Sequence, residues 1–253
     1  RAKRRRQGLP AELRPAKLED MSATAANYVD SDWVTSDIKV TTDADQTPIA
    51  PGNRVSDVTN GNRRTARFVS STPILSFFSI QSADYKLAQR NHNGIQLSVY
   101  YHKGHDWNVP KMLNAMGAAL DYYRANFGPY QFNYARIIEF PGYASFAQAF
   151  AGTMPYSESI GFNANTDDPD KIDFTTYVVA HEMSHQYWAH QVIGADMQGG
   201  TMTSETLAQY SALMVMKHLY GPDKIRRFLK YELDNYLRSR AGEAVEEVPL
   251  ERV

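Results

Sequence analysis

The sequence has 253 residues, of which 43% are hydrophobic and 22% are charged, enough for one large globular domain and part of a second. Its formal net charge of −1 argues against a protein that binds nucleic acid, because such proteins carry an excess of basic residues. The chain contains no cysteine, which excludes disulfide bonds and thiolate ligands, so a metal site must use histidine and carboxylate groups.

The first 30 residues are predicted to form a linker. They contain dispersed charges and prolines rather than a periodic apolar pattern. The basic cluster Arg1–Arg6 has the composition of segments that lie beside anionic membranes, and equally that of a solvated linker. No run of about 18 apolar residues occurs in the sequence, so we expect no membrane-spanning helix within it.

Strand patterns dominate the chain from about residue 31 onward. Four segments alternate polar and apolar residues or are rich in β-branched and aromatic residues, and turn-forming residues separate them. The predicted strands are residues 33–40, 65–69, 74–80 and 95–101.

Helical periodicity follows from about residue 108. Asn108 and Pro110 are typical of a helix start, and Gly128-Pro129 of a helix stop, which predicts one helix between them. The later predicted elements are a buried strand at 137–140, an edge strand beside a cleft at 157–162, and helices at about 173–191, 204–219 and 223–240. This succession of strands and helices predicts an α+β fold.

The strongest functional motif is at residues 181–185, which read His-Glu-Met-Ser-His. Two histidines four residues apart lie on the same face of a helix, so His181 and His185 can bind one metal ion. Glu182 lies about 100° away around the helix axis, where it can act as a general base toward a water molecule. Glu205 begins the next helical pattern and can supply a third ligand, which leaves one position of a zinc ion open.

Each of these residues also has a structural explanation. A pair of helical histidines is often a solvated or a core pair, and a carboxylate such as Glu205 is favoured in the first turn of a helix by the helix dipole. The joint occurrence of the motif and Glu205 at this spacing favours a zinc hydrolase. His190 is predicted to be structural, or at most to support a ligand, because it lies one position away from the spacing of a third histidine ligand.

The sequence around the motif resembles the aminopeptidase N family of gluzincins, in which His-Glu-x-x-His-Gln-Trp is followed by Asn-Glu-Gly-Phe-Ala. Here the two blocks read His-Glu-Met-Ser-His-Gln-Tyr-Trp at residues 181–188 and Ser-Glu-Thr-Leu-Ala at residues 204–208. Residues 204–216 are most similar to a branch of the family that forms an extra domain on bacterial ABC-type transporter permeases. The resemblance extends from about Asp32 to the end of the chain.

The resemblance implies a thermolysin-like zinc metallopeptidase domain, with a mixed sheet, an edge strand and helices, over residues 93–253. Residues 31–92 would be the carboxy-terminal part of a β-rich amino-terminal domain, and residues 1–30 a linker beside the membrane. The chain would then be a soluble fragment of a membrane-bound bacterial protein that carries permease segments elsewhere.

The activity that the resemblance implies is removal of an amino-terminal residue from a peptide. Zinc would be the cofactor, held by His181, His185 and Glu205, and Glu182 would be the catalytic residue. These roles coincide with those that the spacing of the motif indicates.

A second block bears on the substrate. The family's Gly-x-Met-Glu-Asn signature holds the free α-amino group of the substrate through its glutamate, and residues 155–162 occupy that place. Glu158 matches the anchoring glutamate, Ser159 replaces the asparagine, and Gly161 matches a following glycine. These three residues are expected to bind substrate, although the replacements weaken the case for strict aminopeptidase specificity.

Two departures leave other functions open. The gap between His185 and Glu205 is one residue longer than in most aminopeptidases of this group and matches thermolysin-like endopeptidases. The family's oxyanion-stabilising tyrosine has no match before residue 253, so the chain is expected to be truncated at its carboxy-terminal end and weakly active or inactive alone. The alternatives are an endopeptidase of thermolysin type and a low-activity peptide-binding or regulatory module of an ABC transporter permease.

Overall fold

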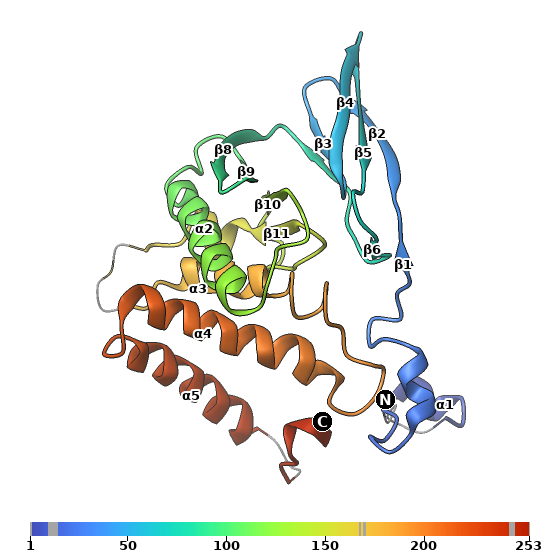
Figure 1. The fold of residues 1–253 in the computed structure, drawn as a ribbon, viewed down its shortest axis with the longest axis vertical. Helices are drawn as coiled ribbons and strands as arrows, with labels where there is room; N and C mark the ends of the chain where they lie inside the picture. The colour runs from blue at the N-terminus through green and yellow to red at the C-terminus, as the bar shows by residue number, and fades with distance from the viewer. Residues whose placement is uncertain (1, 10–14, 167, 169–170, 243–245, 253) are drawn as a thin grey trace.

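The computed structural model describes residues 2–9, 15–166, 168, 171–242 and 246–252 and shows a mixed α+β fold (Figure 1). A central four-stranded sheet lies between a group of helices and a smaller β-rich part that the first third of the chain forms. The α+β class predicted from the sequence is confirmed. Among the described residues, no helix has both the length and the apolar character needed to cross a membrane.

The β-rich part consists of three small antiparallel sheets. The largest has the strand order β2-β5-β4 and stands apart at the top of Figure 1. Its strands are β2 (Asp37–Asp43), β4 (Asn53–Asn60) and β5 (Arg63–Val69). The two-stranded sheets pair β1 (Trp33–Val34) with β6 (Ile74–Leu75) and β3 (Thr47–Ile49) with β7 (Gln81–Ala83).

The segment predicted to be a linker contains the short helix α1 (Ala2–Arg6) and a single helical turn, Met21–Ala25. Residues 1 and 10–14 of this segment lie outside the described residues. Ala16 and Asn27 form backbone bridges with Met197 and Ala195. The later part of the segment is therefore attached to the loop that precedes Glu205.

The central sheet has the strand order β11-β10-β9-β8. Strands β9, β10 and β11 are parallel, and β8 pairs antiparallel with β9 through an Asn93-Gly94 turn in which both residues have positive φ. The expected domain boundary between residues 92 and 93 falls inside this hairpin. The strands are β8 (Lys86–His92), β9 (Ile95–Tyr101), β10 (Tyr134–Phe140) and β11 (Thr153–Ser157).

Four long helices pack on this sheet and on one another. Helix α2 contacts β8, β9 and α3, helix α4 contacts α2 and α3, and α5 covers α4. The helices are α2 (Val109–Asn126), α3 (Phe174–Ser184), α4 (Leu207–Tyr220) and α5 (Ile225–Ala241). In α2, Met112, Met116, Leu120 and Tyr123 recur at helical spacing and are all fully buried, which fixes the helix on the core by one face.

Arg136 of β10 joins the central sheet to the β-rich part. Its buried guanidinium donates hydrogen bonds to the carbonyl oxygens of Ala50, at 3.1 Å, and Gly52, at 2.7 Å. It also lies 4.0 Å from the ring centroid of Tyr134, whose hydroxyl accepts a hydrogen bond from the backbone N–H of Gly52. Three charge-assisted or aromatic contacts therefore stabilise a buried cation that pairs with no carboxylate in the described part of the chain.

The extent of several predicted strands is wrong. The strand predicted at residues 33–40 is divided into β1 and β2, and the one predicted at 74–80 ends at Leu75. Strands β3, β4, β7 and β8 were not predicted. Strands β4 and β8 lie at sheet edges, and most of their residues are polar and exposed. Because they have no apolar face, their sequences lack the apolar alternation from which a strand is predicted.

The predicted edge strand at residues 157–162 is also wrong. Strand β11 ends at Ser157, and residues 158–162 form a wide helical turn in which the N–H of Asn163 donates to the carbonyl of Glu158. The turn requires a glycine at position 161, because a Cβ there would stand 2.2 Å from the ring of Tyr156. Asn108 precedes α2 as predicted, but its side chain donates to the carbonyl of Gly161 instead of capping the helix.

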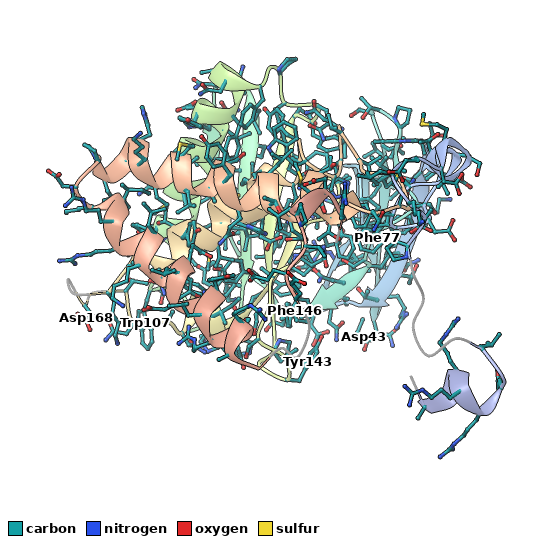
Figure 2. All side chains as sticks on the ribbon, turned by 90° about the horizontal axis from the view of Figure 1, so that it is seen from below. Asp43, Phe77, Trp107, Tyr143, Phe146 and Asp168 are labelled. Atoms are coloured by element: carbon teal, nitrogen blue, oxygen red, sulfur yellow. The ribbon has the colours of Figure 1, made fainter. Side chains whose placement is uncertain are left out.

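The edge of the sheet beside β11 is formed by residues 146–150. Phe146 begins this segment and packs against Phe140 of β10, with ring centroids 5.0 Å apart. Tyr143, which lies near Phe146 in Figure 2, packs against the same ring at 5.5 Å. These aromatic contacts hold the loop after β10 against the end of the sheet.

Candidate metal centre

Helix α3 carries both histidines of the motif. Asp173 caps its start by accepting hydrogen bonds from the first turn. The helix ends immediately before His185, so the predicted extension to residue 191 is wrong. Beyond the motif the carbonyl of Trp188 turns toward His185, and Ala189 has φ of 141°, so the backbone leaves the helical path.

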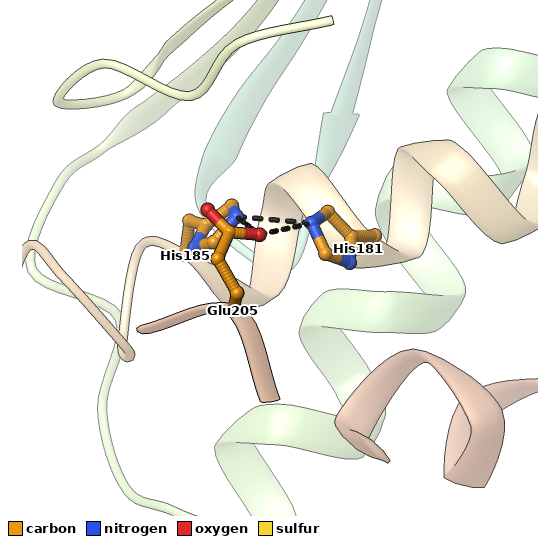
Figure 3. Close-up of side chains that lie close together, drawn as sticks. All are labelled: His181, His185 and Glu205. Carbon is orange, nitrogen blue, oxygen red and sulfur yellow. Dashed lines mark hydrogen bonds and ion pairs between the residues drawn. The ribbon is translucent and has the colours of Figure 1, made fainter. Parts of the chain in front are cut away.

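Three predicted ligands converge on one point. Nε2 of His181 and Nε2 of His185 are 3.0 Å apart, and Oε2 of Glu205 lies 3.4 and 3.6 Å from them, respectively (Figure 3). Glu205 reaches this point from the helical turn Met202–Thr206, which leads directly into α4. The contact between α3 and α4 therefore sets the distance between the ligands.

The hydrogen bonding of His185 determines which of its nitrogens faces the group. Its Nδ1 is 3.0 Å from the carbonyl oxygen of Trp188, which can only accept a hydrogen bond. Nδ1 therefore carries a proton, and in the neutral ring Nε2 keeps its lone pair and points toward His181 and Glu205. This tautomer is the one that a metal ligand needs.

The pKa values show that the group attracts positive charge. The contacts with His181 and His185 hold the pKa of Glu205 well below its usual range. Burial lowers the pKa of His185, but Glu205 and the charge of Glu182 outweigh burial and raise it. These contacts favour the ionised carboxylate of Glu205 and a positive charge on the ring of His185.

Glu182 lies beside this group and is not part of it. Its side chain is buried, and burial raises the pKa of its carboxyl above the usual value, against the opposing influence of His181 and His185. No hydrogen bond among the described residues contributes to that shift. A buried carboxylate without a fixed partner is available to take up and release a proton.

A cavity of about 250 Å³ opens beside the motif, and His181 and Glu182 both line it. Its apolar wall includes Ile160, Phe174 and Val178. The cavity is large enough for a peptide side chain. It places substrate-sized space next to the candidate base.

The edge segment 146–150 also reaches this cavity. The backbones of Phe146 and Gln148 hydrogen-bond to β11, so the segment runs antiparallel to that strand. In this register the N–H and C=O of Ala147 point away from β11, and Ala147 lines the same cavity as His181. An unpaired backbone edge therefore faces the space beside the candidate metal centre.

Two residues after the motif, Gln186 and His190, fix this edge. The side chain of Gln186 donates to the carbonyl of Phe150, at 3.0 Å, and accepts from the N–H of Gly152, at 2.8 Å. Nε2 of His190 donates to the carbonyl of Ala149, at 3.1 Å. The structural role that the sequence analysis expected for His190 agrees with this position. For Gln186, the only signal in the sequence was its position directly after the motif.

Glu158 lies in a different group from the predicted zinc ligands. Its Oε1 accepts a hydrogen bond from the N–H of Gly142, at 2.8 Å, and its Oε2 is 3.9 Å from Nδ1 of His105. Among the described residues, Glu158 is not one of those that line the cavity beside His181. Glu158 thus belongs to a separate group of side chains with His105 and Glu139, and its role as an amine anchor stays a prediction.

The other two expected substrate residues have structural contacts. The hydroxyl of Ser159 lies 3.0 Å from that of Ser145 and 2.9 Å from that of Ser157. Gly161 packs against Tyr156. Within the described part of the chain, the cavity is lined by Ile160, which lies between these two residues, and by neither of them.

The convergent group fits a zinc ion in geometry and in donor chemistry. A tetrahedral ion about 2.1 Å from each ligand atom would separate those atoms by about 3.4 Å, close to the separations of 3.0, 3.4 and 3.6 Å found here. Two neutral imidazoles and one carboxylate suit zinc and leave a fourth position open. Nδ1 of His181 is buried and has no hydrogen-bond partner among the described residues, whereas a hydrogen bond from Nδ1 orients His185.

Comparison with known proteins adds no assignment to this geometry. No family model and no curated protein matches the sequence. The resemblance to the gluzincins remains a prediction, and the function has to be argued from the residues that converge in the structure.

Proposed function

We propose that this chain is a zinc-dependent metallopeptidase with a thermolysin-like catalytic fold. One observation carries the proposal: His181, His185 and Glu205 converge on one point, while the buried Glu182 lines the adjoining cavity. The resemblance of both sequence blocks to gluzincins supports the same function.

The residues of the site have separate roles in the proposed reaction. A zinc ion held by the two histidines and Glu205 would supply a Lewis acid beside the substrate carbonyl. Glu182 would take a proton from the attacking water and then deliver it to the leaving amine. Because burial raises its pKa, the carboxyl of Glu182 gains basicity for the first of these transfers.

The edge segment would position the peptide. An extended substrate can add to an exposed sheet edge through main-chain hydrogen bonds. The outward N–H and C=O of Ala147 offer such bonds at the cavity that His181 and Glu182 line. Gln186 and His190 hold this edge against the end of α3, so the chain itself sets the distance between the substrate backbone and the base.

The position of Glu158 favours a second candidate, an endopeptidase, over the aminopeptidase that the sequence resemblance implies. An aminopeptidase needs a group that holds the free α-amine near the cleaved bond, and Glu158 is engaged elsewhere with Gly142 and His105. The two functions are distinguished by a pair of peptides of identical sequence, one with a free and one with an acetylated amino terminus. Acetylation abolishes cleavage by an aminopeptidase and leaves cleavage by an endopeptidase unchanged.

The direct test of the proposed function is Glu182→Gln. This change removes the base and leaves the three ligands, so hydrolysis of a fluorogenic peptide should fall by about 10²- to 10⁴-fold. Bound zinc, measured by elemental analysis, should stay the same. Glu19→Gln, at an exposed glutamate of the amino-terminal segment, is the matched control and should change neither quantity. Equal hydrolysis by the wild type and Glu182→Gln would contradict the proposal.

A further inference from the structure

A second group of metal-ligating side chains lies at the carboxyl ends of three neighbouring parallel strands. Glu139 is the penultimate residue of β10, Glu158 directly follows β11, and His105 is in the loop after β9. The carboxyl ends of these parallel strands meet at one edge of the sheet, so the strand pairing brings the three residues together.

The side chains of this group are oriented toward one another. Nδ1 of His105 lies 2.5 Å from Oε1 of Glu139 and 3.9 Å from Oε2 of Glu158. The other oxygen of each carboxylate accepts a backbone N–H, from His102 at 2.5 Å and from Gly142 at 2.8 Å. The backbone therefore fixes both carboxylates with one oxygen turned inward, as outer hydrogen bonds do for metal ligands.

The charges of the group do not balance without a cation. The side chain of Glu139 is only 3% exposed and that of Glu158 is 31% exposed. Among the described residues, no lysine or arginine forms an ion pair with either carboxylate, and the only other imidazole nearby is His102, with its ring 5.3 Å from that of His105. One imidazole carries at most one positive charge, so His105 alone cannot balance two carboxylates.

We infer that His105, Glu139 and Glu158 form a second divalent-cation site. A divalent cation with a neutral His105 brings the group to zero net charge, which a single proton does not. One imidazole nitrogen and two carboxylate oxygens suit Zn²⁺ or Mn²⁺, because imidazole favours the first and carboxylates favour the second. The exposed side of Glu158 leaves room for water to complete the coordination. The site shares no ligand with the group at His181.

Metal stoichiometry tests this inference separately from peptidase activity. The full chain, stripped with a chelator and re-equilibrated with Zn²⁺, should retain two zinc ions, one for each group. Glu158→Gln should retain one, His181→Ala should retain one, and the double variant should retain none. Asp121→Asn is the matched control, because Asp121 pairs with His92 at 2.8 Å on the surface without a third ligand, and it should retain both ions.

Mn²⁺ binding gives a second readout that does not depend on the folding of one variant. In His181→Ala, electron paramagnetic resonance should show one bound Mn²⁺ with coupling to an imidazole nitrogen, and His105→Gln should abolish that coupling. One zinc ion per wild-type chain that Glu158→Gln still retains, or two in both Glu158→Gln and His105→Gln, would overturn the inference. If Glu182→Gln loses hydrolysis but keeps both metal ions, the result concerns the first site alone. It does not contradict the second site.

Discussion

Nδ1 of His185 donates to the carbonyl oxygen of Trp188, 3.0 Å away, at the point where the backbone leaves α3. The end of the helix and the orientation of the ligand therefore have one cause. If the helix continued to residue 191 as the sequence predicted, the Trp188 carbonyl would be committed to a helical hydrogen bond. The early end of α3 is what makes that carbonyl available to His185.

Glu205→Gln should weaken zinc binding by more than about 100-fold, because loss of even an outer hydrogen-bond partner typically costs 10- to 100-fold. The amide keeps the shape of the carboxylate and removes the charge that His181 and His185 face. Competition with a zinc-binding dye measures the affinity. Glu19→Gln serves again as the control, and an unchanged affinity in Glu205→Gln would exclude it as a ligand.

Gln186→Ala should destabilise the fold by about 1–3 kcal/mol, because it leaves the N–H of Gly152 and the carbonyl of Phe150 without their partner. Urea denaturation gives the free energy of unfolding. Gln7→Ala, at an exposed glutamine of the amino-terminal segment, should change it by less than about 0.5 kcal/mol. Equal effects of the two substitutions would show that Gln186 does not secure the edge segment.

His190 should make the fold sensitive to acid. Burial lowers the pKa of His190 to about 4, and none of the described residues offers its Nδ1 an acceptor for a second proton. In an unfolded chain the pKa is about 6.5, so below that pH the unfolded state binds a proton that the folded state does not. The contribution of His190 is complete above about pH 6.5 and declines by up to about 3 kcal/mol as the pH falls toward 4.

The acid sensitivity can be assigned by substitution. His190→Gln can still donate to the carbonyl of Ala149 and does not titrate, so its free energy of unfolding should depend less on pH between 6.5 and 4.5. Denaturation midpoints at several pH values provide the comparison. An identical pH dependence in both proteins would show that His190 is not the titrating group.

Gly161→Ala should destabilise the chain by about 1–3 kcal/mol, because the added Cβ would stand 2.2 Å from the Tyr156 ring and 2.7 Å from Met112. Zinc content should not change, since the glycine serves packing. Gly242→Ala, where the nearest atom would be 3.8 Å away, is the matched control and should be nearly neutral. A loss of zinc in Gly161→Ala without a loss of stability would contradict this role.

The sequence predicted the parts of the site that depend on local spacing. His181 and His185 are one helical turn apart, and Glu205 begins the next helical segment, so their convergence needs only that α3 and α4 pack together. The edge of the sheet could not be predicted in the same way. Residues 146–150 are held beside β11 by backbone hydrogen bonds and by the side chains of Gln186 and His190, and none of these contacts leaves an apolar period in the sequence.

The group formed by His105, Glu139 and Glu158 could not be predicted from the sequence for a different reason. His105 and Glu139 are 34 residues apart, and they meet because β9 and β10 are parallel neighbours with a particular register. Sequence spacing carries no information about such a register. For Glu158, the resemblance to a family signature suggested a substrate contact, while the helical turn after β11 directs its carboxylate toward Gly142.

The most direct test of the central claim is anomalous diffraction at the zinc absorption edge from crystals of the chain grown with Zn²⁺. We expect a peak about 2.0–2.2 Å from Nε2 of His181, Nε2 of His185 and a carboxylate oxygen of Glu205. A chain with an ordered α3 and α4 but no peak between these three side chains would contradict it.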